Sequence, residues 1–182
     1  MNFKISQLHN SNRLNDIYNL RVLSYENSPK SNLINSQTYP NGMFDSLDSN
    51  KNTLHWIVED NNIIVASARL AILDDIGDIK DVKETIDINK IPNTRPFAYF
   101  SRLVILEDYR KLGIRSLLDD IRIEYLKKNE NIKFAIAWAI SKRHNSLEEL
   151  GFNNIGSNNY SWANGFSEVL SMYLKINTQQ LN

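Results

Sequence analysis

The feature that most constrains this chain is the stretch EDYRKLGIRSLLDD, residues 107–120, which joins an extended apolar segment directly to an amphipathic helix. The preceding run FAYFSRLVI, residues 97–105, has the aromatic and β-branched composition of a strand. The segment therefore predicts a strand, a loop and a helix in immediate succession. Beyond Gly113, apolar residues recur at helical spacing and predict one buried stripe: Ile114, Leu117, Leu118, Ile121 and Tyr125.

A junction of this kind leaves the first backbone N–H groups of the helix without intrahelical acceptors. Those groups and the helix dipole favour an anion, and Arg110, Lys111 and Arg115 add positive charge around Gly113. An ordinary surface turn with solvated charges explains the same residues equally well. The segment thus raises two hypotheses, a phosphate-binding loop and a tight turn.

The composition narrows the functional classes. The chain has 182 residues, enough for one domain with a substantial core. Twenty-one basic residues match twenty-one acidic ones, and a zero net charge argues against nucleic acid or an anionic membrane as partner. The absence of cysteine excludes disulfides, a thiolate nucleophile and cysteine-ligated zinc. Without a signal peptide or an apolar run of about 18 residues, we expect a cytoplasmic protein.

The order of the predicted elements indicates a mixed α/β sheet in a single domain covering residues 1–182. Residues 74–96 are acidic and weakly hydrophobic, and we interpret them as an insertion between the third and fourth strands. Strands are predicted at residues 2–8, 53–59, 63–73, 97–105, 132–140, 155–162 and 167–176, and helices at 12–27, from 113 onward and at 141–150.

Residues 101–118, SRLVILEDYRKLGIRSLL, resemble the acyl-CoA-binding motif of the GNAT superfamily of N-acyltransferases, in which R/Q-x-x-G-x-G/A follows the fourth strand. Residues 135–152, AIAWAISKRHNSLEELGF, are similar to the family's next strand and helix with its YEKLGF ending. Residues 20–27 and 44–70 are similar to a bacterial branch. The resemblance implies a GNAT fold, a single mixed sheet of about six to seven strands flanked by about four helices and splayed between strands four and five.

This resemblance implies an acyl-CoA cosubstrate, most simply acetyl-CoA, and no metal. The acyl group would pass directly to a primary amine of a small molecule or peptide, without a covalent enzyme intermediate. A homodimer is a further expectation from the resemblance. The pantetheine arm would lie along Leu103, Val104 and Ile105, and the pyrophosphate on Arg110, Lys111, Leu112, Gly113, Ile114, Arg115 and Ser116.

Three positions depart from the family pattern. Arg115 replaces a glycine or alanine, and we expect it to make a charge-assisted contact with a phosphate instead of blocking the groove. Leu147 replaces the tyrosine that commonly protonates the leaving thiolate, so that His144, Ser146 or water would act there unless catalysis is lost. Tyr99 lies in the region where many members keep a glutamate as base.

Three residues are candidates for handling the proton of the amine: His55 as a base, and Tyr99 and Ser101 by positioning a water. A structural histidine is the favoured interpretation of His55. Four further residues are candidates for substrate binding. Asp45 and Asp48 would hold a cationic group unless they cap a turn, and Arg69 and Arg102 would bind a carboxylate unless they form structural ion pairs.

Two alternative functions remain open. One is suggested by polar residues spaced like those of the autoinducer-synthase and N-acyl-amino-acid-synthase branch, whose members take long acyl chains from acyl carrier protein. The other is a GNAT-fold module that binds an acyl-CoA without turning it over, as the departures at Arg115, Leu147 and Tyr99 suggest. The polar residues behind the first alternative are Arg21, Asp45, Asp48, Arg69 and Arg102.

Overall fold

The computed structural model describes residues 3–9, 11–28, 30–79, 87–162 and 165–176. The chain forms two compact units, one from Met1–Leu70 and Arg102–Arg122 and the other from Ala71–Ser101 and Ile123–Asn182. Strand β4, Phe97–Ile105, contains the point at which the chain passes from the second unit to the first.

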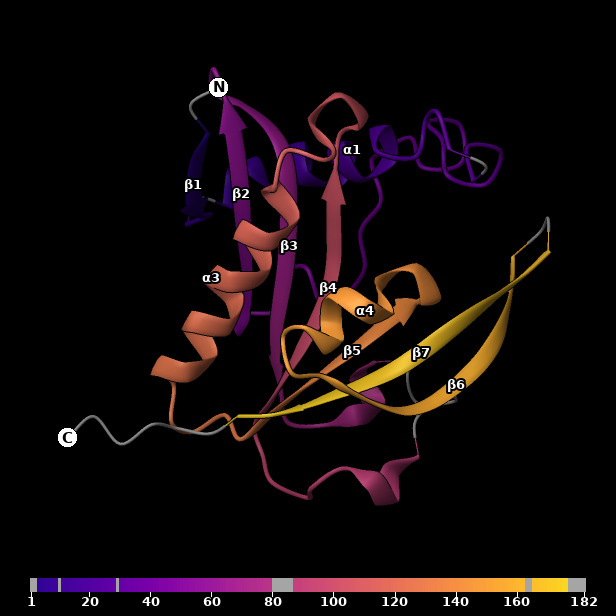
Figure 1. Ribbon diagram of the computed structural model, residues 1–182. Coiled ribbons are helices and arrows are strands. Elements are labelled where there is room, and N and C mark those ends of the chain that lie inside the picture. Colours follow the sequence, from indigo (N-terminus) through magenta and orange to yellow (C-terminus); the bar gives the residue numbers. More distant parts are fainter. Residues whose placement is uncertain (1–2, 10, 29, 80–86, 163–164, 177–182) are drawn as a thin grey trace. The chain divides into compact units, whose positions relative to one another are not determined.

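Seven strands form one mixed sheet in the order β1-β2-β3-β4-β5-β7-β6, which confirms the predicted fold class (Figure 1). In the first unit, β1 (Lys4–Gln7) runs antiparallel to β2 (Thr53–Asp60). The connection from β2 to β3 (Ile63–Leu73) uses Asn61 and Asn62 at φ 50° and 66°. Asparagine tolerates this left-handed region better than most residues, so the sequence DNN at residues 60–62 suits a tight turn between the two strands.

Strand β5 (Phe134–Ile140) lies between two partners in the second unit. It pairs in parallel with β4 from Ala98↔Ala135 to Phe100↔Ala137, and antiparallel with β7 (Gly165–Lys175). Its first four residues are buried, as an apolar strand covered on both faces requires. Strand β6 (Asn153–Trp162) pairs with β7 at the end of the sheet order. The parallel register covers three residue pairs, although β4 itself continues to Ile105.

Three α-helices lie in the described part of the chain: α1 (Leu14–Leu23), α3 (Ile114–Lys128) and α4 (His144–Glu148). A short 3-10 turn, Ser11–Arg13, precedes α1. The apolar face of α1 packs on the strands of its own unit, which is why a helix of only ten residues is stable there. This core cluster contains Ile17, Leu20, Ile57, Ile64 and Val104.

The predicted insertion, residues 74–96, contains two short 3-10 turns, Ile76–Asp78 and Ile88–Lys90, while residues 80–86 lie outside the described residues. Arg95 Nε donates to the carbonyl oxygen of Asp74 at 2.9 Å, which ties the two ends of the insertion together. Separately, none of the helices in the described ranges is long and apolar enough to cross a membrane.

Candidate active site

The loop between β4 and α3 has the conformation that a backbone anion site needs. A 3-10 turn, Glu107–Tyr109, follows β4, and α3 begins at Ile114 (Figure 1). Between them, Lys111 and Gly113 adopt φ values of 64° and 78°, which turn the chain sharply into the helix. A Cβ placed on Gly113 would have no other part of the protein within 4 Å. The positive φ therefore favours glycine at this position, and the position faces open space.

The backbone donors of this loop are not used internally. Arg110 N–H bonds Glu107 O at 3.0 Å, and Leu117 N–H bonds Gly113 O at 3.2 Å. Between these two, no backbone hydrogen bond among the described residues uses the N–H groups of residues 111–116. Six consecutive donors at a helix N-terminus form an environment suited to a phosphate.

The side chain of Arg110 is occupied within the protein. Its Nη2 donates to Ser24 O at 2.7 Å, just beyond the end of α1, and its Nε lies 3.4 Å from Ile105 O. Tyr109 fixes the loop a second time, because its hydroxyl donates to Asp60 Oδ2 at 3.0 Å. Arg110 thus holds the loop in place through its side chain.

The three residues predicted to line the pantetheine arm differ in orientation. Val104 belongs to the core cluster with α1, so its side chain packs inward, whereas Leu103 and Ile105 are half-buried. Any contact of Val104 with a ligand is accordingly limited to its backbone.

The predicted apolar stripe of α3 is wrong at one position. Leu117 is 42% exposed, while Asp119 and Arg122 are buried. The inward row runs at intervals of four through Ile114, Leu118 and Arg122, and Asp119 lies beside it. The pattern of hydrophobic residues could not predict this arrangement, because charged residues such as Asp119 and Arg122 are expected to face solvent.

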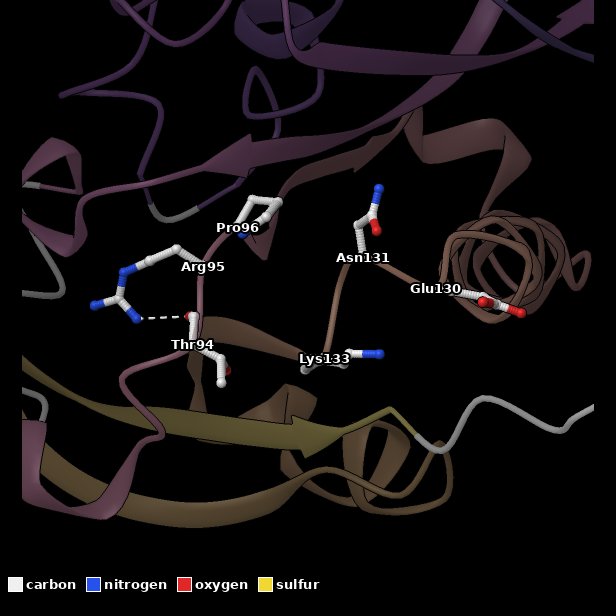
Figure 2. Close-up of a pocket in the computed structure, with 6 residues that line it drawn as sticks. All are labelled: Thr94, Arg95, Pro96, Glu130, Asn131 and Lys133. Atoms are coloured by element: carbon white, nitrogen blue, oxygen red, sulfur yellow. Dashed lines mark hydrogen bonds between the residues drawn. The ribbon is translucent and has the colours of Figure 1, made fainter.

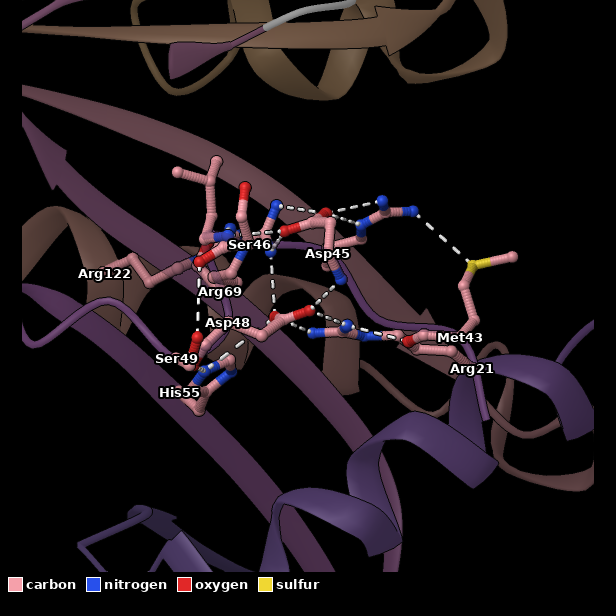
Figure 3. A network of polar contacts seen from close by, with 11 residues as sticks. Arg21, Met43, Asp45, Ser46, Asp48, Ser49, His55, Arg69 and Arg122 are labelled. Atoms are coloured by element: carbon pink, nitrogen blue, oxygen red, sulfur yellow. Dashed lines mark hydrogen bonds and ion pairs between the residues drawn. The ribbon is translucent and has the colours of Figure 1, made fainter. Parts of the chain in front are cut away.

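The first unit also contains an acid–arginine cluster, of which Figure 3 labels Arg21, Asp45, Asp48 and Arg69. Its fifth member is Arg102, which pairs with Asp45. Arg21 makes two bonds of 2.7 Å to the two oxygens of Asp48. Arg69 Nη1 bridges both carboxylates, at 2.5 Å to Asp45 Oδ1 and 2.8 Å to Asp48 Oδ1. Arg102 Nη2 closes the chain at 2.6 Å from Asp45 Oδ2.

The electrostatics keep both carboxylates ionised. Burial by itself would raise the pKa of Asp48, but hydrogen bonds and charge from Arg21, with the charge of Arg69, hold the pKa far below its usual range. Burial opposes ionisation of Asp45 too, and Arg69 and Arg102 outweigh it, so that its pKa is also lowered. Three guanidinium groups against two carboxylates give the five side chains a formal charge of +1.

The cluster changes how its four predicted substrate-binding residues are interpreted. Arg69 is buried and paired with Asp48, which is the structural ion pair left open for Arg69 from the sequence. Asp48 Oδ2 accepts the Asp45 N–H at 2.9 Å and Asp45 Oδ1 accepts the Leu47 N–H at 3.0 Å, which is the turn cap left open for both acids. Arg102 and Asp45 are more accessible, with side chains 32% and 30% exposed. Arg102 has φ 52°, a left-handed conformation inside β4 that is costly for a side chain with a Cβ. Such strain is common where a side chain is held for function.

His55 lies behind the cluster and is 5% exposed. Its Nε2 is 3.2 Å from the carbonyl oxygen of Asp48, and Nδ1 has no hydrogen-bond partner among the described residues. Burial lowers the pKa of His55, although the nearby Asp48 acts in the opposite direction. A neutral imidazole that supports the Asp48 backbone fits this environment.

The other two predicted catalytic residues lie on β4 within the second unit. Tyr99 is buried and pairs with Ile136 of β5, and Ser101 is half-buried. Their role in proton transfer stays a prediction.

Helix α4 carries both residues predicted to replace the missing tyrosine, His144 and Ser146. His144 Nε2 lies 3.2 Å from Glu148 Oε1, and its side chain is 29% exposed. Leu147 is buried in the core, and its carbonyl accepts the Phe152 N–H at 3.0 Å where Gly151, at φ 92°, ends the helix. Ser146 is also buried, accepting from Arg143 Nη1 at 2.7 Å and donating to Arg143 O at 2.9 Å. Its hydroxyl is therefore engaged on both sides.

A pocket of about 510 Å³ lies in the second unit at the start of β4 (Figure 2). Arg95 donates from Nη1 to Thr94 O at 2.8 Å beside it. None of the residues predicted for the site lines this pocket, and we assign it no role in the chemistry. Its lining is Thr94, Arg95, Pro96, Glu130, Asn131 and Lys133.

No family model matches the sequence, and no curated protein matches it. Solved structures do match, at 11–16% identity. An acetyltransferase of the GNAT family from Streptococcus pneumoniae aligns with TM-score 0.67 at 15% identity, covering 97% of this chain and 100% of that one. The chain has the GNAT fold. Two further solved structures align with similar TM-scores.

One is FeeM, an N-acyl amino acid synthase from uncultured soil microbes, with TM-score 0.68, 11% identity and coverage of 96% and 91%. The other is the CoA-dependent acyl-homoserine lactone synthase BjaI, with TM-score 0.70, 16% identity and coverage of 96% and 84%. The GNAT fold thus agrees with the family resemblance of the loop motif. At such low identity, the activity of this chain has to be argued from its own residues.

Proposed function

We propose that the protein is an N-acyltransferase that holds an acyl-CoA on the loop of residues 111–116 and transfers the acyl group to a primary amine. The observation that carries this proposal is the set of six backbone N–H groups left without internal acceptors at the start of α3. Open space around Gly113 allows a diphosphate to approach them. Lys111 and Arg115 are exposed on the same loop and add positive charge.

The reaction requires one bond exchange. The neutral amine attacks the thioester carbonyl carbon, the new C–N bond replaces the C–S bond, the nitrogen loses a proton and the thiolate leaves. CoA supplies the activated thioester, and this chain supplies binding and orientation. Because Leu147 is in the core and Ser146 is engaged, we assign the protonation of the thiolate to His144 or to solvent, the two remaining candidates. Acetyl-CoA is the simplest donor.

The decisive test compares Gly113→Asp with Gly113→Asn. Both side chains tolerate the left-handed backbone at this position and have nearly the same shape. Only aspartate places a negative charge beside the diphosphate. We expect CoA to bind Gly113→Asp at least about 30-fold more weakly than Gly113→Asn in calorimetric titration, since like charges a few ångströms apart repel by about 2 kcal/mol or more.

Equal CoA affinity of the two variants, with similar unfolding midpoints, would contradict the proposed loop. A second readout concerns turnover. Thiol release from acetyl-CoA is expected with at least one amine of a broad panel. Tight CoA binding without release for any amine would instead favour the alternative of a non-catalytic acyl-CoA-binding module.

A second candidate function is acylation of an amino acid, in the manner suggested by the names of two of the similar structures. The acid–arginine cluster supports it, because its five side chains carry a formal charge of +1 and its most accessible members are Arg102 and Asp45, which are half-buried. A site of this charge favours an acceptor that bears a carboxylate. Acyl groups longer than acetyl, from CoA or a carrier protein, belong to this candidate.

A further inference from the structure

Two charged residues face inward on α3, the helix that begins at the proposed CoA loop. Arg122 is 1% exposed and Asp119 is 2% exposed, on the face where the neighbouring turns bury Ile114 and Leu118. A buried ion pair is seldom the most stabilising choice for such a position, because removing two charges from water is costly. Their placement therefore calls for another explanation.

Arg122 uses three of its nitrogens to join two elements. Nε donates to Leu118 O at 3.0 Å and Nη2 to Asp119 Oδ1 at 2.5 Å, both within α3. Nη1 donates to the carbonyl oxygen of Arg69 in β3 at 3.2 Å. Helix α3 is thus bonded to β3 at Arg69. The guanidinium of Arg69 in turn bridges Asp45 and Asp48.

A second connection joins the same two regions. Arg110, which directly precedes the loop of residues 111–116, donates to Ser24 O. Ser24 follows α1, the helix that carries Arg21 of the cluster. The CoA loop and the acid–arginine cluster are consequently joined at both β3 and α1 by arginine side chains bonded to backbone carbonyls. Hydrogen bonds of this kind fix position, since the acceptors belong to the main chain.

We propose that Arg122 is a positioning residue that couples the donor loop to the acid–arginine cluster, so that occupancy of the loop orders Asp45, Asp48 and Arg69. This inference rests on the proposed function, because it needs CoA to bind residues 111–116. When a ligand at one site orders a second site, the two sites share a coupling free energy. That coupling needs contacts that connect the two sites physically.

Hydrogen–deuterium exchange of the full chain, with and without CoA, tests the coupling. In wild type and in Lys127→Met, an exposed position on the same helix, CoA is expected to slow exchange at residues 110–118 and at 43–48. In Arg122→Met, which keeps an apolar side chain of similar reach, we expect protection at 110–118 to persist. Protection at 43–48 should fall at least about threefold, with CoA affinity changed by less than about threefold.

The outcomes separate the two proposals. Unchanged protection of 43–48 in Arg122→Met, or none there in wild type with CoA bound, would overturn the coupling. Absence of CoA binding to wild type would instead reject the proposed function. If Arg122→Met does not fold, Arg122→Lys serves in its place, because it retains the charge but has one nitrogen to share among three acceptors. It is expected to lose the protection at 43–48 in the same way.

Discussion

At the scale of single residues, His55 illustrates how burial decides between two roles. The sequence offered it as a base, and the structure encloses it against the Asp48 carbonyl. Since its pKa is lowered on folding, the unfolded chain binds more protons than the folded chain between the folded pKa and about pH 6.5. Its contribution to stability is therefore fully present above that pH and is lost as the pH falls towards the folded pKa.

We expect His55→Gln, which retains a donor for the Asp48 carbonyl, to flatten the fall in unfolding free energy between about pH 7 and 5. The slope removed is at most about 1.4 kcal/mol per pH unit, the limit for one proton. Urea unfolding at several pH values measures it. Acyl transfer should change by less than about threefold. A loss of about 100-fold or more would identify His55 as a base after all.

The same residues show what the sequence could and could not predict. The sequence identifies Arg21, Asp48 and Arg69 as polar residues spaced like those of the synthase branch. Only the fold shows that Asp48 pairs with both arginines. The turn at Gly113 could be predicted from the sequence, because a strand, a loop and a helix follow one another there within a few residues. The positive φ of Arg102 had no sequence signal, since arginine is not a residue expected there.

At the scale of elements, the strands were predicted more accurately than the faces of the helices. Strand β4 has the predicted bounds, because an apolar run flanked by turn residues is a strong signal. Helix α3 also begins where expected, but its inward face includes Asp119 and Arg122. Tertiary hydrogen bonds to β3 and within the helix decide that orientation, and periodicity does not contain them.

Helix α3 also carries a cation where helices usually avoid one. Arg115 is in the first turn, which has no acidic residue, and the positive end of the helix dipole disfavours it. We expect Arg115→Ala to raise the unfolding free energy by about 0.3–1 kcal/mol and to weaken CoA binding by about tenfold at low salt. The loss should shrink at high salt. Denaturant unfolding and calorimetric titration measure the two effects, with Lys127→Ala as control. Unchanged CoA affinity would contradict a phosphate contact, and a lower unfolding free energy would contradict the unfavourable interaction with the helix dipole.

At the scale of the whole molecule, acidic and basic residues balance over the chain as a whole but not within the acid–arginine cluster. The chain has equal numbers of acidic and basic residues, yet the acid–arginine cluster carries +1. Composition could exclude a polyanionic partner, because that partner needs an overall basic excess. It could not address a small anionic acceptor, which responds only to the charges a few ångströms away.

That local excess predicts the acceptor. With a given acyl-CoA, amino acids should be acylated with kcat/KM at least about tenfold higher than their amides, because a charge-assisted hydrogen bond contributes about 1.5–3 kcal/mol. Arg102→Met should abolish the preference while leaving CoA affinity within about threefold, and an exposed cation of α3, in Lys128→Met, serves as control. Thiol release measured over matched acid and amide pairs decides it. If amides react as fast as acids in wild type, the cluster is a structural ion-pair network, and the acceptor is a simple amine bound without recognition of a carboxylate.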